Sequence, residues 1–179
     1  MFSLDNLIAD CKSAVANGRS AQAEVREILT KAVSEPGAVM KELGEPEKGG
    51  VVKLYDSDEL TIINVIWSPF MTIVPHNHEM WANIGIYTGR EDNIFWRRIK
   101  DAEDGYIEAA GAESLGLTDA TSLGRDIIHS VTNPLNKLTG AIHIYGGDFF
   151  RVERSEWDAE SHHERPYDMA KNLKMLADA

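Results

Sequence analysis

The sequence predicts a mainly β protein whose strands close into an antiparallel barrel or sandwich, preceded by a helical segment. From Val51 onward, short β-branched and aromatic runs recur between turn residues, with no helical pattern between them. Strands in such a series are expected to pair antiparallel, because a parallel sheet needs helices as crossovers. Before Val51 the apolar residues recur at helical spacing, which indicates that helices precede the strands.

Three helices are predicted in this first segment. Ser3 and Ser20 are the expected N-caps of the first two, because a serine hydroxyl can accept a hydrogen bond from a free N–H at a helix start. Gly18 ends the first helix, and Gly44 ends a short third helix that begins after Pro36. The apolar faces are formed by Leu4, Leu7, Ile8, Cys11 and Val15 in the first helix and by Val25, Ile28, Leu29 and Val33 in the second.

We interpret residues 1–179 as a single domain, because this length is enough for one hydrophobic core. It comprises a helical N-terminal cover over residues 1–45, a β-barrel over residues 51–154 and a C-terminal tail over residues 155–179. The tail is predicted to be partly helical, over residues 167–177. The expected strands are Val51–Tyr55, Leu60–Trp67, Met71–Val74, Trp81–Tyr87, Ile94–Ile99, Tyr106–Ala110, Ile127–Val131, Ala141–Tyr145 and Phe149–Val152.

The composition excludes several classes of function. With 43% hydrophobic and 26% charged residues, the chain resembles a soluble globular protein, and no apolar run is long enough to cross a bilayer. The net charge of −11 argues against nucleic-acid binding, which needs clustered Lys and Arg. The amino terminus lacks a basic region followed by an apolar stretch, so we expect no signal peptide and a cytoplasmic location. Cys11 is the single cysteine, which leaves no intrachain disulfide and no thiolate cluster for a metal.

The histidines are the most informative residues. His76 and His78 are two apart, so on an extended segment both imidazoles project from the same face and can meet one ion. His129 lies in a second β-like run. Neutral imidazole is the commonest metal ligand among side chains, and three of them leave coordination positions open. His162 and His163 are adjacent, so their side chains diverge, and we interpret them as surface residues.

The order and spacing of these residues resemble the two sequence motifs of the cupins. The first cupin motif has His-x-His, a Glu three or four residues later and then a Gly after six more, which is Gly89 here. The second motif, His-x-x-x-Asn, is matched by His129 and Asn133. The resemblance covers roughly residues 51–154. It implies a cupin double-stranded β-helix, or jelly-roll, barrel with a metal on His76, His78 and His129.

The Glu of the first motif is absent. It should fall at Ala82 or Asn83, while Glu79 is adjacent to His78 and would point to the opposite face of a strand. A cupin with three His and no Glu resembles the thiol dioxygenases, which hold iron on three neutral histidines. A neutral ligand set leaves Fe(II) more positive and so favours an anionic thiolate. Fe(II) is therefore the expected metal, and Ni, Zn or Cu are the alternatives that three imidazoles also accept.

A second group of residues follows the histidines along the chain. Ala141, His143 and Tyr145 alternate along a predicted strand and therefore share a face. Thiol dioxygenases carry Ser-x-His-x-Tyr at the matching place, which implies catalytic roles for His143 and Tyr145. Because Ala141 replaces the Ser, one hydrogen-bond partner of His143 is expected to be missing, unless Thr139 or a water substitutes.

A substrate that carries a carboxylate needs a cation in the pocket, and the Arg guanidinium can bind a carboxylate with two hydrogen bonds. Arg154 lies nine residues beyond Tyr145. This spacing resembles the bacterial mercaptopropionate dioxygenases, in which the Arg at that position holds the substrate carboxylate. The competing candidates for this role are Arg90, Arg97, Arg98 and Arg151.

The resemblance implies a non-haem iron-dependent thiol dioxygenase that uses O2 to oxidise a mercaptopropionate- or cysteine-type thiol to a sulfinate. Two alternatives stay open. The first is a metal-dependent cupin enzyme that acts on another small molecule, and the second is a non-catalytic cupin that binds a ligand or a partner. The pattern of the leading helices fits a monomer or a homodimer equally well.

Overall fold

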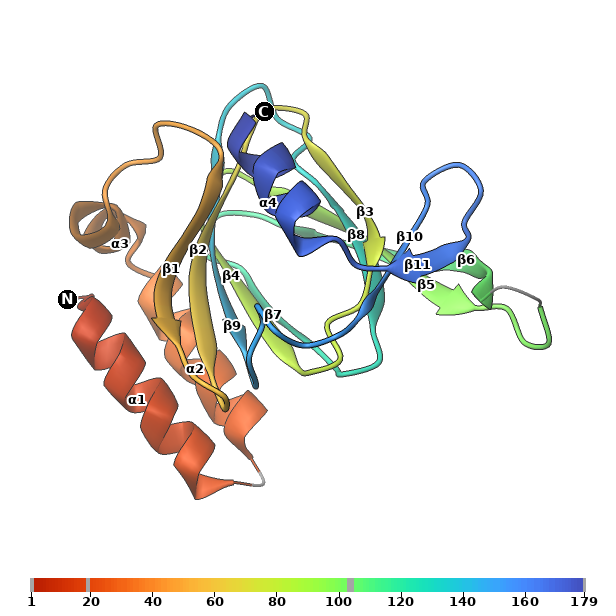
Figure 1. The fold of residues 1–179 in the computed structure, drawn as a ribbon. Coiled ribbons are helices and arrows are strands. Elements are labelled where there is room, and N and C mark those ends of the chain that lie inside the picture. Colours follow the sequence, from red (N-terminus) through yellow and green to blue (C-terminus); the bar gives the residue numbers. More distant parts are fainter. Residues whose placement is uncertain (1, 19, 103–104, 179) are drawn as a thin grey trace.

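The computed structural model describes residues 2–18, 20–102 and 105–178, which form a helical layer and two facing β-sheets (Figure 1). The helices are α1 (Leu4–Asn17), α2 (Ala21–Val33), α3 (Pro36–Leu43) and α4 (Met169–Asp178). The strands are β1 (Gly50–Asp56), β2 (Thr61–Trp67), β3 (Thr72–His76), β4 (Ala82–Thr88), β5 (Glu91–Arg98), β6 (Ile107–Leu115), β7 (Ala120–Leu123), β8 (Ile128–Thr132), β9 (Thr139–Tyr145), β10 (Ser155–Trp157) and β11 (Glu164–Pro166).

The strands form two antiparallel sheets. One has the order β1-β2-β9-β4-β7 and the other has the order β11-β10-β3-β8-β5-β6. Neighbours in each sheet are often far apart in sequence, as in a jelly-roll, where the chain crosses repeatedly from one sheet to the other. The protein is therefore mainly β, with a jelly-roll of the cupin type behind an N-terminal helical segment, and the predicted fold class is confirmed.

The three central strands of the five-stranded sheet, β2, β9 and β4, are buried on both faces. Ile63 and Val65 of β2 point between the two sheets, whereas Ile62 points outward and packs against the helices. Helices α1 and α2 cover this outer face, with Leu29 among the fully buried residues (Figure 1). This double burial explains why β2, β4 and β9 read as continuous apolar runs and not as alternating ones.

The helices begin and end close to the predicted positions. The Ser3 hydroxyl caps α1 by accepting a hydrogen bond from the Asn6 N–H at 3.5 Å. Ser20 precedes α2 as predicted, but its hydroxyl donates to the Glu24 side chain and caps no backbone group. Helix α3 ends at Gly44, where φ is 88° and a glycine is favoured.

The strand predictions contain one error and three omissions. Residues 149–152 form a turn, because the Asp148 carboxylate accepts the N–H groups of Phe150 and Arg151, both at 3.1 Å. The strands β7, β10 and β11 were not predicted, since they span only three or four residues without alternation of apolar and polar residues.

Helix α4 lies against β1 over one end of the barrel (Figure 1). Leu176 of α4 is buried in the core between the sheets. Asn172 anchors the helix by donating to the buried Glu156 carboxylate of β10 at 2.7 Å. Within the described residues, no helix combines the length and the apolar character needed to cross a membrane.

Candidate metal centre

Pairing between β3 and β8 brings two of the predicted ligands together. His76 and His129 are partners in the antiparallel register, although 53 residues separate them in sequence. Directly opposed residues on one face of such a pair have Cβ atoms about 5 Å apart. The register alone therefore places two imidazoles side by side between the sheets.

His78 lies just beyond the end of β3, where β10 holds the chain in place. The Asn77 N–H donates to the Ser155 carbonyl at 3.2 Å, and the Asn77 side chain accepts the Ser155 N–H at 2.8 Å. These two bonds fix the backbone between His76 and His78. The two imidazoles consequently stay on one side, as the spacing of two residues predicts.

The three histidines form a compact and buried cluster. One ring nitrogen of each lies within 4.8 Å of those of the other two, and their exposed fractions are 6%, 2% and 1%. The ring centroids are 5.1 Å apart for His76 and His78, 4.7 Å for His76 and His129, and 4.9 Å for His78 and His129. A single ion can reach all three rings, so this site could hold a metal.

Hydrogen bonds at the far side of two rings select the nitrogen that faces the cluster. His76 Nδ1 lies 3.0 Å from the Val74 carbonyl oxygen, so this nitrogen donates. His129 Nδ1 lies 2.6 Å from Asn93 Oδ1 and donates in the same way. Each bond leaves Nε2 with a free lone pair, which is the form that binds a metal.

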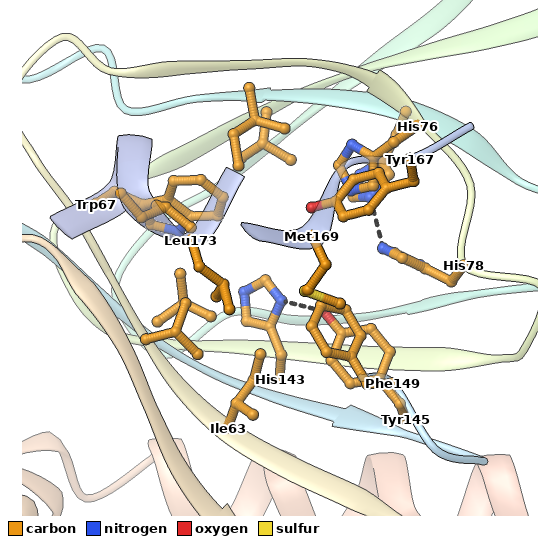
Figure 2. A pocket seen from close by; sticks show the side chains of 16 residues that line it. Ile63, Trp67, His76, His78, His143, Tyr145, Phe149, Tyr167, Met169 and Leu173 are labelled. Carbon is orange, nitrogen blue, oxygen red and sulfur yellow. Dashed lines mark hydrogen bonds between the residues drawn. The ribbon is translucent and has the colours of Figure 1, made fainter. Parts of the chain in front are cut away.

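The cluster contains polar atoms that lack partners of the usual kind. His78 Nδ1 is buried without a hydrogen-bond partner among the described residues. His78 Nε2 lies 3.3 Å from His129 Nε2 (Figure 2). Buried nitrogens at this distance need a shared proton or a cation between them. The donor set, three neutral imidazoles, fits a divalent transition metal such as Fe(II), Ni, Cu or Zn.

Burial keeps these ligands neutral. It lowers the pKa of His76 from 6.5 to about 4, and it lowers the pKa values of His78 and His129 well below 6.5. The positive charge of Arg154 lowers the pKa values of His76 and His78 further. At neutral pH the three rings are therefore ready to bind a metal without first losing a proton.

The histidines open onto a small cavity in the barrel interior (Figure 2). Its volume is about 30 Å³, which holds one or two molecules the size of water, and not an organic acid. Strand residues form most of the apolar wall, and Met169, Leu173 and Leu176 of α4 close it. Tyr167, which precedes α4, also lines the cavity, with its ring centroid 5.7 Å from that of His76. Any larger molecule can enter only if these side chains move.

His143 and Tyr145 line the same cavity. The Tyr145 hydroxyl lies 3.0 Å from His143 Nδ1, and its ring centroid lies 5.1 Å from that of His78 (Figure 2). Burial raises the pKa of Tyr145, so its hydroxyl stays protonated and can donate. The structure thus brings both residues to the candidate metal centre.

The expectation that one hydrogen-bond partner of His143 is missing is confirmed, because His143 Nε2 is buried without a hydrogen-bond partner among the described residues. His143 Nε2 lies 3.4 Å from a carboxylate oxygen of Glu91, a residue with no exposed surface. Thr139 does not substitute for the missing serine, because its hydroxyl bonds to Arg90 and Asn133. A carboxylate from the opposite sheet therefore stands beside His143 where Ala141 offers no hydroxyl.

Arg154 is buried next to the cavity and not within its lining. Its guanidinium carbon lies over two aromatic rings of the lining, 4.2 Å from the Phe149 centroid and 4.3 Å from that of Tyr167. Nη1 donates to the Phe149 carbonyl at 2.6 Å, while Nε and Nη2 are buried with no hydrogen-bond partner among the described residues. The competing arginines instead form surface ion pairs, Arg90 with Asp92, Arg97 with Glu108, Arg98 with Glu164 and Arg151 with Asp148.

Residues at the position of the absent motif Glu make no contact with the cluster. Ala82 is packed in the core, and the Asn83 side chain bonds to Gln22 and Ser122 on the helical side. Glu79 pairs with Asn77 and Arg125 near the surface. Among the described residues, the ligand set therefore contains histidines alone.

Asn133 of the second motif has a structural role. Its side-chain amide donates to the carbonyls of Trp67, Ser68 and Lys137 at 2.8 to 3.1 Å. These bonds tie the loop after β8 to the end of β2. The motif residue thus supports the strand that carries His129 without contacting the metal site.

Comparisons with known proteins found no family model that matches the chain and no similar protein among curated sequences. Solved structures with similarity include a mutant of Bacillus subtilis oxalate decarboxylase, 16% identical, with a TM-score of 0.45 over 60% of this chain and 28% of that chain. An RmlC-like cupin family protein from Methanocaldococcus jannaschii is 10% identical, with a TM-score of 0.46 over 58% of this chain and 84% of that chain. A cupin superfamily protein from Desulfitobacterium hafniense is 14% identical, with a TM-score of 0.45 over 58% of this chain and 84% of that chain. The match spans little more than a quarter of the decarboxylase, and the fold assignment rests on the strand order and register of the chain itself.

Sequence reasoning missed Glu91 and Asn93, which contact the predicted site residues. They are polar residues two apart at the start of β5, and both are buried, with exposed fractions of 0% and 1%. Their spacing shows that they share a face of the strand. That signal was available, but only the register of β5 against β8 reveals that the face is the barrel interior.

Replacing His129 with Gln should lower the affinity for Co(II) or Fe(II) at least about 100-fold, because it removes one of three ligands. Anaerobic titration followed by the visible absorption of Co(II) measures this affinity. His163→Gln, at an exposed position, is the control and should bind as the wild type does. Equal affinities of wild type and His129→Gln would exclude the three-histidine site.

Stability of the metal-free protein should depend on pH in the histidine range. Because the folded pKa values of His76, His78 and His129 lie below 6.5, the unfolded chain binds more protons as the pH falls through 6.5. The free energy of unfolding should therefore change little at pH values slightly above 6.5 and should decrease as the pH is lowered from about 6.5 toward 4. Urea unfolding at a series of pH values measures the slope. An equally steep slope in His129→Gln would contradict this origin.

Proposed function

We propose that this protein is a non-haem iron-dependent thiol dioxygenase that oxidises a small carboxylate-bearing thiol. The observation that carries the proposal is the common cavity of the three histidines and the Tyr145 hydroxyl, which His143 orients at 3.0 Å. In the reaction a thiolate, R–S⁻, and O2 give a sulfinate, R–SO2⁻. Two S–O bonds form, the O–O bond breaks, and O2 accepts the four electrons that the sulfur loses. When bound, Fe(II) would supply the electronic coupling between thiolate and O2.

The residues of the cavity would perform three tasks. Tyr145 would turn its O–H from His143 toward the reacting sulfur or oxygen atoms, because its hydroxyl stays protonated and its ring lies 5.1 Å from that of His78. The apolar wall would exclude water, which strengthens each polar interaction inside it. His143 would hold the Tyr145 hydroxyl in one orientation until the substrate binds.

Arg154 would bind the carboxylate of the substrate. Its two unpartnered nitrogens, Nε and Nη2, are adjacent on the guanidinium and match the two oxygens of a carboxylate. Cation–π contacts with the rings of Phe149 and Tyr167 hold the guanidinium in place. A three-carbon thiol acid exceeds the cavity of about 30 Å³, so the Tyr167 ring must move for the substrate to reach both Arg154 and the metal centre.

A second candidate function is a metal-dependent cupin enzyme that acts on another small molecule. The observation that favours it is Glu91 beside His143, where thiol dioxygenases of the resembled type have a serine hydroxyl. A carboxylate and a hydroxyl differ in charge, so the polarity around His143 differs from that of the resembled enzymes.

Thiol oxidation is tested directly by O2 uptake after anaerobic loading with Fe(II). Mercaptopropionate or cysteine should consume one O2 per thiol and yield a sulfinate that mass spectrometry detects. Cysteamine, which lacks a carboxylate, should react poorly. If iron-loaded protein consumes no O2 with any of the three thiols, thiol dioxygenase activity is excluded, and a screen of other small acids addresses the second candidate.

Replacing Arg154 with Gln should raise KM for the carboxylate-bearing thiol about 10- to 100-fold, the effect of losing a charge-assisted hydrogen bond. KM for cysteamine should change less than threefold. Arg151→Gln, at an exposed position three residues away, is the matched control. An equal rise in KM for both thiols would assign Arg154 a structural role only.

A further inference from the structure

We propose that Glu91 is a positioning residue that sets the ring tautomers of both His143 and His129 from one buried carboxylate. The inference concerns the metal centre itself and holds for any reaction at that centre. It therefore does not depend on thiol oxidation.

Glu91 joins the two sheets through the barrel interior. It belongs to β5 of the six-stranded sheet, while Trp67 of β2 and His143 of β9 belong to the five-stranded sheet. The Trp67 Nε1–H donates to Glu91 Oε2 at 3.0 Å, and Asn93 Nδ2 donates to Glu91 Oε1 at 3.1 Å. Both carboxylate oxygens thus act as acceptors, with no exposed surface on the residue.

The first arm of the network runs to the metal ligand. Asn93 Nδ2 donates to Glu91, so the Asn93 amide can present only its oxygen to His129. That oxygen lies 2.6 Å from His129 Nδ1 and therefore requires a proton on this nitrogen. His129 Nε2 is left with its lone pair toward His76 and His78, in the form that binds a metal.

The second arm runs to Tyr145. Glu91 Oε2 lies 3.4 Å from His143 Nε2 without making a hydrogen bond to it. At this separation the field of a buried carboxylate still favours the tautomer with a proton on Nε2. His143 Nδ1 then carries a lone pair and accepts the Tyr145 O–H at 3.0 Å. Without the carboxylate the opposite tautomer is equally available, and in it Nδ1–H would donate to Tyr145.

A purely structural role for Glu91 is the competing explanation. A fully buried carboxylate is costly, and an apolar residue would join the sheets with less penalty. Unlike an apolar residue, the carboxylate has two acceptor oxygens. Each of them constrains a different histidine. An amide of the same shape has a single acceptor oxygen and cannot constrain both.

The test is Glu91→Gln, compared with wild type and with Tyr87→Phe. Tyr87→Phe is the matched control, because it removes a buried hydrogen bond to Asn64 of 2.9 Å on the helical side of the sheet, outside the cavity lining. Long-range 15N–1H NMR of the metal-free proteins should show Nε2–H on His143 and Nδ1–H on His129 in wild type and control. In Glu91→Gln at least one of the two tautomers should switch.

Metal affinity gives a second readout. Competition for Zn(II) with a chromophoric chelator should show binding about 10- to 100-fold weaker in Glu91→Gln and within threefold of wild type in Tyr87→Phe. Unchanged tautomers together with unchanged Zn(II) affinity would overturn the proposal. If the Zn(II) affinity falls and a tautomer switches while no thiol is oxidised by the wild type, the positioning role stands and the proposed function fails.

Asn93→Ala separates the two arms and provides a test if Glu91→Gln does not fold. It cuts the path to His129 and leaves the contact between Glu91 and His143. Zn(II) affinity should fall about 10-fold or more, while His143 keeps Nε2–H. Wild-type Zn(II) affinity in Asn93→Ala would reject the arm to His129, and a tautomer switch of His143 would reject the independence of the two arms.

Discussion

The antiparallel register of β3 against β8 is the constraint on which the site depends. It sets His76 opposite His129, and the two-residue period of a strand then carries His78 to the same side. A shift of one residue would turn His129 away from the interior and replace it with a neighbour of the opposite face. The register is in turn secured from both sides, by β5 beside β8 and by β10 beside β3. The pairing of the strands therefore fixes how the three histidines are arranged.

The interior combines two environments that usually exclude each other. Much of its wall is apolar, yet four imidazoles and two phenols line it, and the buried Glu91 carboxylate lies beside it. Buried polar groups are tolerated when each has a partner, and most of these do. The exceptions in or beside the cavity are His78 Nδ1, His143 Nε2 and two nitrogens of Arg154. Under the proposed function these groups lie where a metal and an anionic ligand would bind.

Local pattern predicted the parts of the molecule that depend on local spacing. The helices, most strands and the common orientation of His76 and His78 follow from the spacing of residues within a single segment. Residues 149–152 were wrongly predicted as a strand, because their apolar run obscures the turn that Asp148 creates. The contacts of Glu91 with His143 and of Asn93 with His129 could not be predicted, since they join strands whose register no local pattern contains. Arg154 was predicted from a resemblance to the mercaptopropionate dioxygenases, and only the fold shows its contacts with the rings of Phe149 and Tyr167.

The position of α4 has a kinetic consequence. Because Met169, Leu173 and Leu176 line a cavity of about 30 Å³, a molecule larger than a few water molecules does not fit unless this wall moves. Its association rate would then be limited by the frequency with which this wall opens, and would level off as the concentration rises. The anchor between Asn172 and Glu156 sets part of the energy of that opening. The opening of helix α4 would thus select a ligand before the ligand makes any contact with the histidines.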